Sequence, residues 1–130
     1  MRLVQDDAIA KRMIDEAISV CVADPFVGLV IVDKEVVVGA VIVNNYEVQG
    51  SVDISFAGRL SPATLRELAR YLFDMLGVRR VQAVTRFNNV KARLGLERLG
   101  FKLEGFQRER FADCDGALYG LLRRDCKFRF

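Results

Sequence analysis

The segment from Thr85 to Gly105, TRFNNVKARLGLERLGFKLEG, constrains the fold of this chain more than any other. It continues an apolar, β-branched run, Val81 to Thr85, that is typical of a strand. Asn88-Asn89 suits the start of a helix, and in Leu99-Gly100-Phe101 the glycine stands where a helix ends and an aromatic residue begins the next strand. The segment therefore predicts a strand, a polar break, a short amphipathic helix, a glycine turn and a second strand.

The composition limits the chemistry that the chain can perform. With 130 residues, 52% hydrophobic and 28% charged, the chain has the size of one compact domain, and we expect residues 1–130 to form it. The formal net charge is +3 and there is no histidine. This absence excludes imidazole base catalysis, a Ser-His-Asp triad and His-ligated metal sites within this sequence, and no metal site is expected.

The cysteines and the apolar runs indicate a cellular compartment. Cys21, Cys114 and Cys126 are odd in number and lack a paired spacing, which predicts reduced thiols. The N-terminal MRLVQDDAIAKRM lacks the apolar core of a signal peptide, and charges at Asp33, Lys34 and Glu35 interrupt the longest apolar region. We therefore expect a cytoplasmic location and no membrane partner.

The first part of the chain predicts one helix followed by a hairpin. An apolar stripe at spacings of three and four residues follows Asp6-Asp7 and predicts a helix that ends before Pro25. Two β-branched runs, Val27 to Val32 and Val36 to Val43, predict strands joined at Asp33-Lys34-Glu35. The residues of the helical stripe are Ile9, Met13, Ala17, Ile18 and Cys21.

The middle of the chain predicts a strand with two different faces. Gly39, in the strand before it, indicates a β-bulge or a close approach of two backbones. In Ser51 to Ala57, apolar residues alternate with polar or small ones, so one face is apolar and the other more polar. The polar face, which carries Asp53 and Ser55, is suited to line a cleft.

The second half predicts two helices and a closing hairpin. Ser61-Pro62 is a strong helix start, and the apolar stripe that follows ends at Gly77. The last two strands, Lys102 to Phe111 and Ala117 to Leu122, are joined by Asp113-Cys114-Asp115-Gly116, whose Asp-Gly step is a hairpin signal. The predicted order of elements is α, β, β, β, α, β, α, β, β.

This order from Phe26 to Leu122, with Asn89, the Leu-Gly-Phe helix end and Glu104-Gly105, resembles the GNAT superfamily of acyl-CoA-dependent N-acyltransferases. The resemblance implies an α/β (α+β) fold with a mixed central sheet of six to seven strands, flanked by three helices. It also implies a splay between the Ser51–Ala57 and Val78–Arg86 strands that admits the pantetheine arm of acetyl-CoA, the expected co-substrate.

The resemblance assigns residues to that co-substrate. Main-chain groups of Ile54, Phe56 and Gly58 would pair with pantetheine as an additional strand. Asn89 matches an asparagine that many family members place where the helix begins beside the cofactor arm; its other interpretation is an N-cap, and both roles are compatible. The resemblance also assigns Arg93 to the cofactor. At this position many GNAT enzymes have a tyrosine that protonates the departing CoA thiolate.

The main departure from the family lies between the central strand and the next helix. GNAT enzymes usually carry Gln/Arg-x-x-Gly-x-Gly/Ala there, whereas this chain has Arg59-Leu60-Ser61-Pro62-Ala63-Thr64. The glycines let backbone N–H groups approach a pyrophosphate at a helix N-terminus. Ser61 and Thr64 still offer N–H and hydroxyl donors, and we expect Arg59 and Arg66 to compensate through hydrogen bonds to phosphate.

Acyl transfer to an amine also needs a route for its proton and donors for the thioester oxyanion. Asp53 and Ser55 are the candidates for the proton route, directly or through water; the alternative is that they face solvent or cap nearby backbone. Tyr119 and Tyr46 are candidate acids for the thiolate, and the alternative for each is amphipathic packing. Cys126 is interpreted as a small buried hydrophobe.

The second half of the chain is rich in arginine. A solvated face explains this pattern, and nucleic acid is not an expected partner, because neighbouring residues on a strand point to opposite faces and form no single stripe. The basic groups are Arg79-Arg80, Arg108-Arg110 and Arg123-Arg124-Lys127-Arg129.

We therefore expect an N-acetyltransferase that uses acetyl-CoA to acetylate a primary amine of an unknown acceptor, a small molecule or a protein, by direct attack. A monomer or a homodimer is expected. The alternative is a catalytically degenerate GNAT-fold binding or inhibitory module, which the Arg59 to Thr64 loop favours. Phe56-Ala57-Gly58-Arg59 and Leu121 to Lys127 resemble small acetyltransferase-like proteins of tailed phages and prophages, which would place the protein in a host cytoplasm, acting on a host protein.

Overall fold

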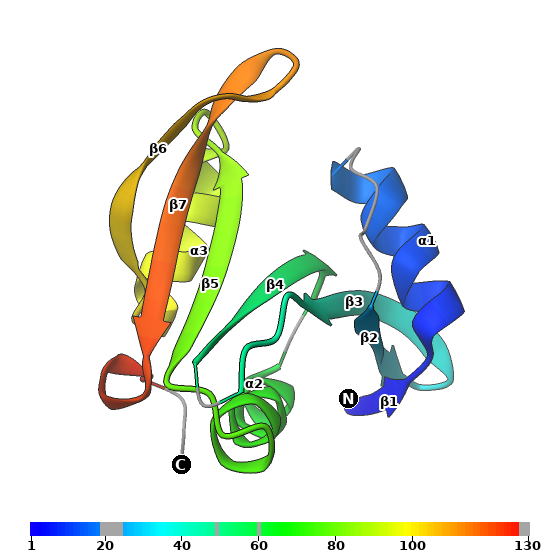
Figure 1. The fold of residues 1–130 in the computed structure, drawn as a ribbon. Helices are drawn as coiled ribbons and strands as arrows, with labels where there is room; N and C mark the ends of the chain where they lie inside the picture. The colour runs from blue at the N-terminus through cyan, green and yellow to red at the C-terminus, as the bar shows by residue number, and fades with distance from the viewer. Residues whose placement is uncertain (19–24, 49, 60, 128–130) are drawn as a thin grey trace.

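The computed structural model describes residues 1–18, 25–48, 50–59 and 61–127, and its central feature is one mixed sheet (Figure 1). The described strands form a seven-stranded sheet in the order β1-β2-β3-β4-β5-β7-β6. β4 and β5 pair in parallel and the other neighbours pair antiparallel. The strands are β1 (Arg2–Gln5), β2 (Phe26–Asp33), β3 (Val36–Asn44), β4 (Ser51–Gly58), β5 (Arg80–Arg86), β6 (Lys102–Phe111) and β7 (Cys114–Leu122).

Helices cover both faces of the sheet. α1 (Asp7–Ile18) packs on the face that carries Val30, Ala40 and Ile42. The opposite face packs against α2 (Pro62–Ala69), its π-helical continuation η1 (Arg70–Met75) and α3 (Val90–Leu99). A short 3₁₀ helix, η2 (Arg123–Asp125), follows β7. The mixed sheet and the three α-helices confirm the fold class that the sequence predicts.

Local capping explains where the helices begin and end. The Asp6 carboxylate accepts from the Ile9 N–H at 3.0 Å, and Asn89 Oδ1 accepts from the Ala92 N–H at 3.1 Å. Gly100 ends α3 with φ +107°, and a Cβ at this position would collide with the Asp125 carbonyl oxygen, so glycine is required there. The predicted helix starts and the glycine stop are confirmed.

Some predicted details are wrong. The closing hairpin turns at Ala112-Asp113, and the predicted Asp115-Gly116 step lies inside β7, where the Asp115 carboxylate accepts from the Glu109 N–H at 2.8 Å. β1 was not predicted, because its four residues carry no long apolar run. The π-helical end of the second helix also leaves no sequence signal. Cys21, at the end of the predicted first helix, lies outside the described residues.

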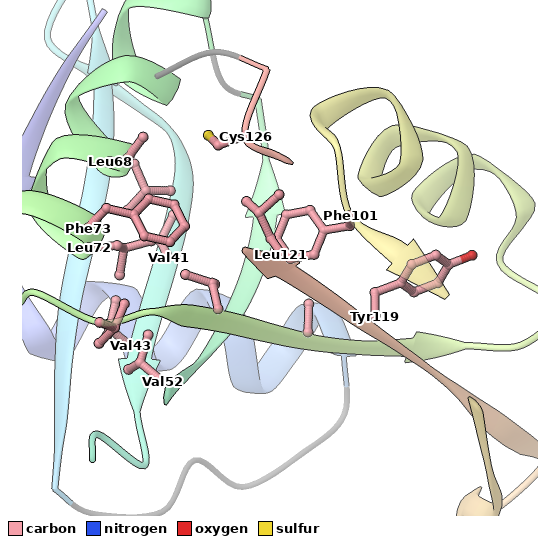
Figure 2. Close-up of a cluster of buried hydrophobic side chains, with 14 of the residues drawn as sticks. Val41, Val43, Val52, Leu68, Leu72, Phe73, Phe101, Tyr119, Leu121 and Cys126 are labelled. Atoms are coloured by element: carbon pink, nitrogen blue, oxygen red, sulfur yellow. The ribbon is translucent and has the colours of Figure 1, made fainter. Parts of the chain in front are cut away.

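The main core lies between the sheet and the α2–η1–α3 layer (Figure 2). Phe73, Val52 and Val81 are almost completely buried in it, and Cys126 is 6% exposed, as its interpretation as a buried hydrophobe predicts. Tyr119 lies at the edge of this cluster with its hydroxyl directed away from Leu68 and Phe73. Among the described helices, none has the length and apolar character needed to cross a membrane.

Candidate functional site

β4 and β5 separate after a short paired stretch, as the resemblance implies. They are paired only at Ser51–Arg80, Val52–Val81 and Asp53–Gln82, although both strands continue well beyond these positions. β5 remains paired with β7 on its other side, and β4 remains paired with β3. Figure 1 shows the two strands meeting at one end and diverging toward the other. The sheet is therefore open between the far halves of β4 and β5.

The register of β4 determines which main-chain groups face this opening. The Arg59 N–H donates to the Val38 carbonyl at 3.0 Å, and this pairing places the odd-numbered residues of β4 in hydrogen bonds with β3. Main-chain groups alternate in direction along a strand, so those of Ile54 and Phe56 point away from β3. By the same alternation, the main-chain groups of Gly58, at the end of β4, also point away from β3. These are the three residues that the resemblance assigns to pantetheine.

Gly58 is fixed by its close approach to β3. It has φ +93°, and a Cβ here would collide with the Val38 carbonyl oxygen. Its partner in the register is Gly39, whose own Cβ would lie 2.8 Å from the Arg59 carbonyl oxygen. A register shift between Ile31 and Val32 lies beside Gly39, so both the predicted close approach and a bulge occur here. This contact determines where the chain leaves β4 toward α2.

The side chains of β4 divide between the two faces of the sheet. Ile54 packs against the main core, and Phe56 on the same face is 39% exposed. Asp53 and Ser55 alternate with them and share the face of α1, and both are half-buried. The Asn45 amide donates to the Asp53 carboxylate at 2.7 Å. The predicted polar face thus exists, and one of its two candidates already has a side-chain partner.

The N-terminus of α2 uses its donors internally. Ser61 and Thr64 form a capping box, in which the Thr64 N–H donates to Ser61 Oγ at 3.2 Å and the Ser61 N–H to Thr64 Oγ1 at 2.9 Å. The Leu65 N–H donates to the Ser61 carbonyl, and Pro62 has no N–H. Thr64 is 1% exposed. Of the first turn, only the Ala63 N–H has no partner among the described contacts, so the two capping residues shape the loop instead of offering donors to a ligand.

Two cations lie just before α2 and in its last turn. Arg59 directly follows β4, and Arg66 lies within the helix; both are exposed. Within the described part of the chain, neither side chain forms an ion pair or a hydrogen bond. Arg59 is therefore available to an anionic ligand at the place where the family's glycine loop is missing, whereas Arg66 is exposed in the last turn of the helix.

Asn89 and Arg93 begin α3 beside the far end of β5. The Asn89 side chain is occupied as the N-cap, which confirms that interpretation and leaves its contact with a cofactor untested. Arg93 Nε donates to the Tyr119 hydroxyl at 3.0 Å, and Arg93 Nη1 donates to the Phe87 carbonyl at 3.0 Å. The guanidinium carbon lies 5.0 Å from the centroid of the Phe87 ring and 5.9 Å from that of Phe106. These contacts hold the Arg93 side chain against β7 and β6.

The two candidate phenols have different surroundings. Tyr119 is 0% exposed and its hydroxyl accepts from Arg93, so it is a packed residue with a polar end. Tyr46 precedes β4, and its hydroxyl donates to the Leu76 carbonyl at 2.9 Å. That position is at the paired end of β4 and β5, away from the opening. Tyr46 is therefore wrong as a candidate acid, because the loop before β4 holds it at the other end of the sheet.

Two arginine pairs meet where the sequence predicts separate, solvated faces. Arg79-Arg80 precede and begin β5, and Arg123-Arg124 lie in η2 directly after β7, not on a strand. Because β5 and β7 are antiparallel neighbours, the start of one lies beside the end of the other. Both pairs line one cavity at the paired end of the sheet. No sequence signal predicts this meeting, since it depends on the pairing of distant strands.

Comparisons with known proteins identify the fold. No family model and no curated protein matches the chain. A GCN5-related N-acetyltransferase from Brucella melitensis superposes with a TM-score of 0.67 and 25% identity, over 79% of this chain and 53% of that one. The N152L mutant of spermidine N-acetyltransferase SpeG from Vibrio cholerae superposes with a TM-score of 0.67 and 19% identity, over 77% of this chain and 66% of that one. The chain thus has the fold of GNAT acetyltransferases and spans less than two thirds of the length of these structures.

Proposed function

We propose that the protein is an N-acetyltransferase that transfers an acetyl group from acetyl-CoA to a primary amine. The observation that supports this most strongly is the opening between β4 and β5, toward which the main-chain groups of Ile54 and Phe56 point. An extended ligand with alternating amides can complete the hydrogen bonding of such an edge. The pantetheine arm of CoA has this chemistry, so the residues present fit it.

The phosphate end of the ligand would depend on side chains. The capping box and Pro62 leave a single N–H in the first turn of α2, so the backbone provides little for a pyrophosphate. Arg59 and Arg66 would hold it through charge-assisted hydrogen bonds, each contributing about 1.5–3 kcal/mol when formed. Arginine side chains would replace the glycine loop of the family.

The transfer step would use main-chain donors and the polar face of β4. An unpaired N–H on β4 would stabilise the oxyanion that develops as the amine attacks the thioester carbonyl. Asp53 and Ser55 would accept the proton of the amine, directly or through water. Tyr119 accepts from Arg93, so its own proton remains available for the sulfur of the departing thiol. Attack would be direct, without a covalent enzyme intermediate.

The site residues, a monomeric or homodimeric state and an origin in a phage remain predictions from the sequence. A single compact domain over residues 1–130 is likewise proposed. The acceptor class is the least defined part of the proposal, and the spermidine acceptor named for the Vibrio structure is a reasonable first amine to test.

Calorimetric titration with CoA and acetyl-CoA tests the proposal. Arg59→Ala should weaken binding about tenfold, whereas Arg12→Ala, an exposed arginine on α1, should leave it unchanged. At the helix start, Asn89→Ala removes both the cap and any ligand contact, and Asn89→Ser keeps a capping hydroxyl. Binding lost in both variants would assign Asn89 to the ligand; binding kept in Asn89→Ser would leave it as a cap.

Turnover is measured as release of free thiol from acetyl-CoA with a panel of primary amines, including spermidine. Acetylation of any amine, reduced in Asp53→Asn, would support the proposed chemistry. If neither CoA nor acetyl-CoA bound at millimolar concentration, the enzyme proposal would fail. The remaining interpretation would then be a GNAT-fold module that binds another protein.

A further inference from the structure

A cavity lies at the end of the sheet where β4 and β5 are paired, opposite the proposed acyl-CoA site. Its volume is about 800 Å³, within the range of small-molecule sites. It lies between the loop before β4, the turn before β5, and η2. Its lining residues are Glu47, Gly50, Ser51, Gly77, Val78, Arg79, Arg80, Leu122, Arg123 and Arg124.

Arginines are the main charged residues that line this cavity. Four of its lining residues are arginines and one, Glu47, is acidic. The arginines come from two neighbouring segments, because Arg79 and Arg80 lie at the start of β5 and the other two lie in η2, directly after β7. A ligand in the cavity would lie beside arginines of both segments.

Two of the arginines are held in place by the fold. Arg80 donates to Glu104 at 2.7 Å and to Gln82 at 2.8 Å. Its side chain and that of Glu104 lie over Gly120 of β7, where any Cβ would collide with them. Arg123 donates to the Phe73 carbonyl at 2.8 Å and pairs with Asp74. A guanidinium has five N–H donors, so each of these arginines keeps donors for a ligand after making its internal contacts.

The other two arginines have different constraints. The Arg79 N–H donates to the Gly50 carbonyl at 2.8 Å, which fixes the backbone of this segment. Arg124 is exposed and forms no ion pair or hydrogen bond within the described residues. Its charge is therefore not compensated by a nearby carboxylate. Val78 and Leu122 add apolar side chains to the lining, and Gly50 and Gly77 add backbone without a side chain.

We propose that this cavity binds the polyphosphate group of a small ligand. Guanidinium forks match phosphate oxygens in geometry and charge, and four arginines from two neighbouring segments suit a ligand with more than one anionic group. A single carboxylate would engage only part of this set. The site is separate from the proposed CoA site, because Arg59 and the start of α2 follow the far end of β4. Both inorganic polyphosphate and a nucleoside triphosphate carry the required group.

Calorimetric titration with sodium triphosphate and with ATP, at low and at physiological ionic strength, tests the proposal. Arg124→Gln should weaken triphosphate binding about tenfold, and Arg79→Gln should do the same. The control is Arg98→Gln, an exposed arginine in the last turn of α3, outside the cavity. Thermal unfolding of each variant shows whether the fold is kept.

The outcomes distinguish a free polyphosphate from a nucleotide, and the cavity from the CoA site. Equal affinities for triphosphate and ATP would support a free polyphosphate, and tighter ATP binding would support a nucleotide; both agree with the proposal. Absence of heat at low ionic strength, or an equal loss in Arg98→Gln, would overturn it. Loss of triphosphate binding in the presence of saturating CoA would also overturn the proposal, because triphosphate would then bind at the CoA site at the other end of the sheet. The titration is decisive even if the protein does not bind CoA.

Discussion

Arg93 Nε donates to the Tyr119 hydroxyl at 3.0 Å and thereby joins the first turns of α3 to the centre of β7. Arg93 occupies the position at which the resemblance expects a tyrosine, and Tyr119 lies on the strand beside β5. The helix position at which the resemblance expects a phenol is thus joined through an arginine to a buried phenol on the sheet. This contact can be tested for stability and for catalysis.

Replacing Tyr119 with phenylalanine should lower the free energy of unfolding by about 1 kcal/mol, because the half-buried Arg93 donor loses its acceptor while the ring packing is kept. Denaturant titration measures the change. Tyr46→Phe is the control. Tyr46 is 44% exposed, so water can replace its lost contact, and this substitution should lower the free energy of unfolding by less than Tyr119→Phe. An unchanged or increased stability of Tyr119→Phe would contradict the proposed energetic role of this hydrogen bond.

Replacing Gly58 with alanine should destabilise the protein by about 2 kcal/mol or more, because φ +93° disfavours a side chain and the Val38 carbonyl occupies the Cβ position. Gly95 of α3 is a matched control, since a Cβ there would meet no atom within 4 Å. Gly95→Ala should raise stability by about 0.5–1 kcal/mol through helix propensity. Equal effects at the two positions would refute the close approach of β3 and β4.

The Arg80–Glu104 pair makes stability depend on acid pH. The hydrogen bond from Arg80 holds the pKa of Glu104 below its ordinary value of 4.5. The pair therefore stabilises the fold fully above pH 4.5, and this contribution is lost as the pH falls through the lowered pKa. Because Glu104 is partly exposed, the contribution should be below about 1 kcal/mol.

Glu104→Gln should consequently have a lower free energy of unfolding than the wild type at neutral pH. On acidification, its free energy of unfolding should fall by less than that of the wild type. Urea unfolding at neutral and at acid pH measures both quantities. Glu97→Gln, an exposed carboxylate of α3 without an ion pair in the described part of the chain, should leave the pH profile unchanged. A Glu104→Gln profile parallel to the wild type would show that this pair is not coupled to folding.

Much of the fold could be predicted because its signals are local. Ser61-Pro62, Asn89 and Gly100 act through capping within one turn, and they are where the sequence indicates. The hairpin turn predicted at Asp115-Gly116 is wrong because cross-strand packing places these residues inside β7. A Cβ at Gly116 would meet Arg110 and Val84. The short β1 depends on its pairing with β2, and no local sequence pattern predicts it.

The candidate site was predictable only in part. The three residues facing the opening followed from a resemblance in the order of elements, since backbone binding leaves little trace in side chains. The contact between Arg93 and Tyr119 and the meeting of Arg79-Arg80 with Arg123-Arg124 arise from tertiary contacts. Such contacts join residues far apart in the sequence, so spacing alone does not reveal them.

The most direct test of the central claim is the change in backbone amide NMR signals when CoA is added. We predict that the changes map to Ile54–Gly58, to the start of α2 and to the start of α3, and that the residues of the arginine-lined cavity do not shift. Changes confined to that cavity, or no changes at saturating CoA, would contradict the claim that the opening between β4 and β5 is an acyl-CoA site.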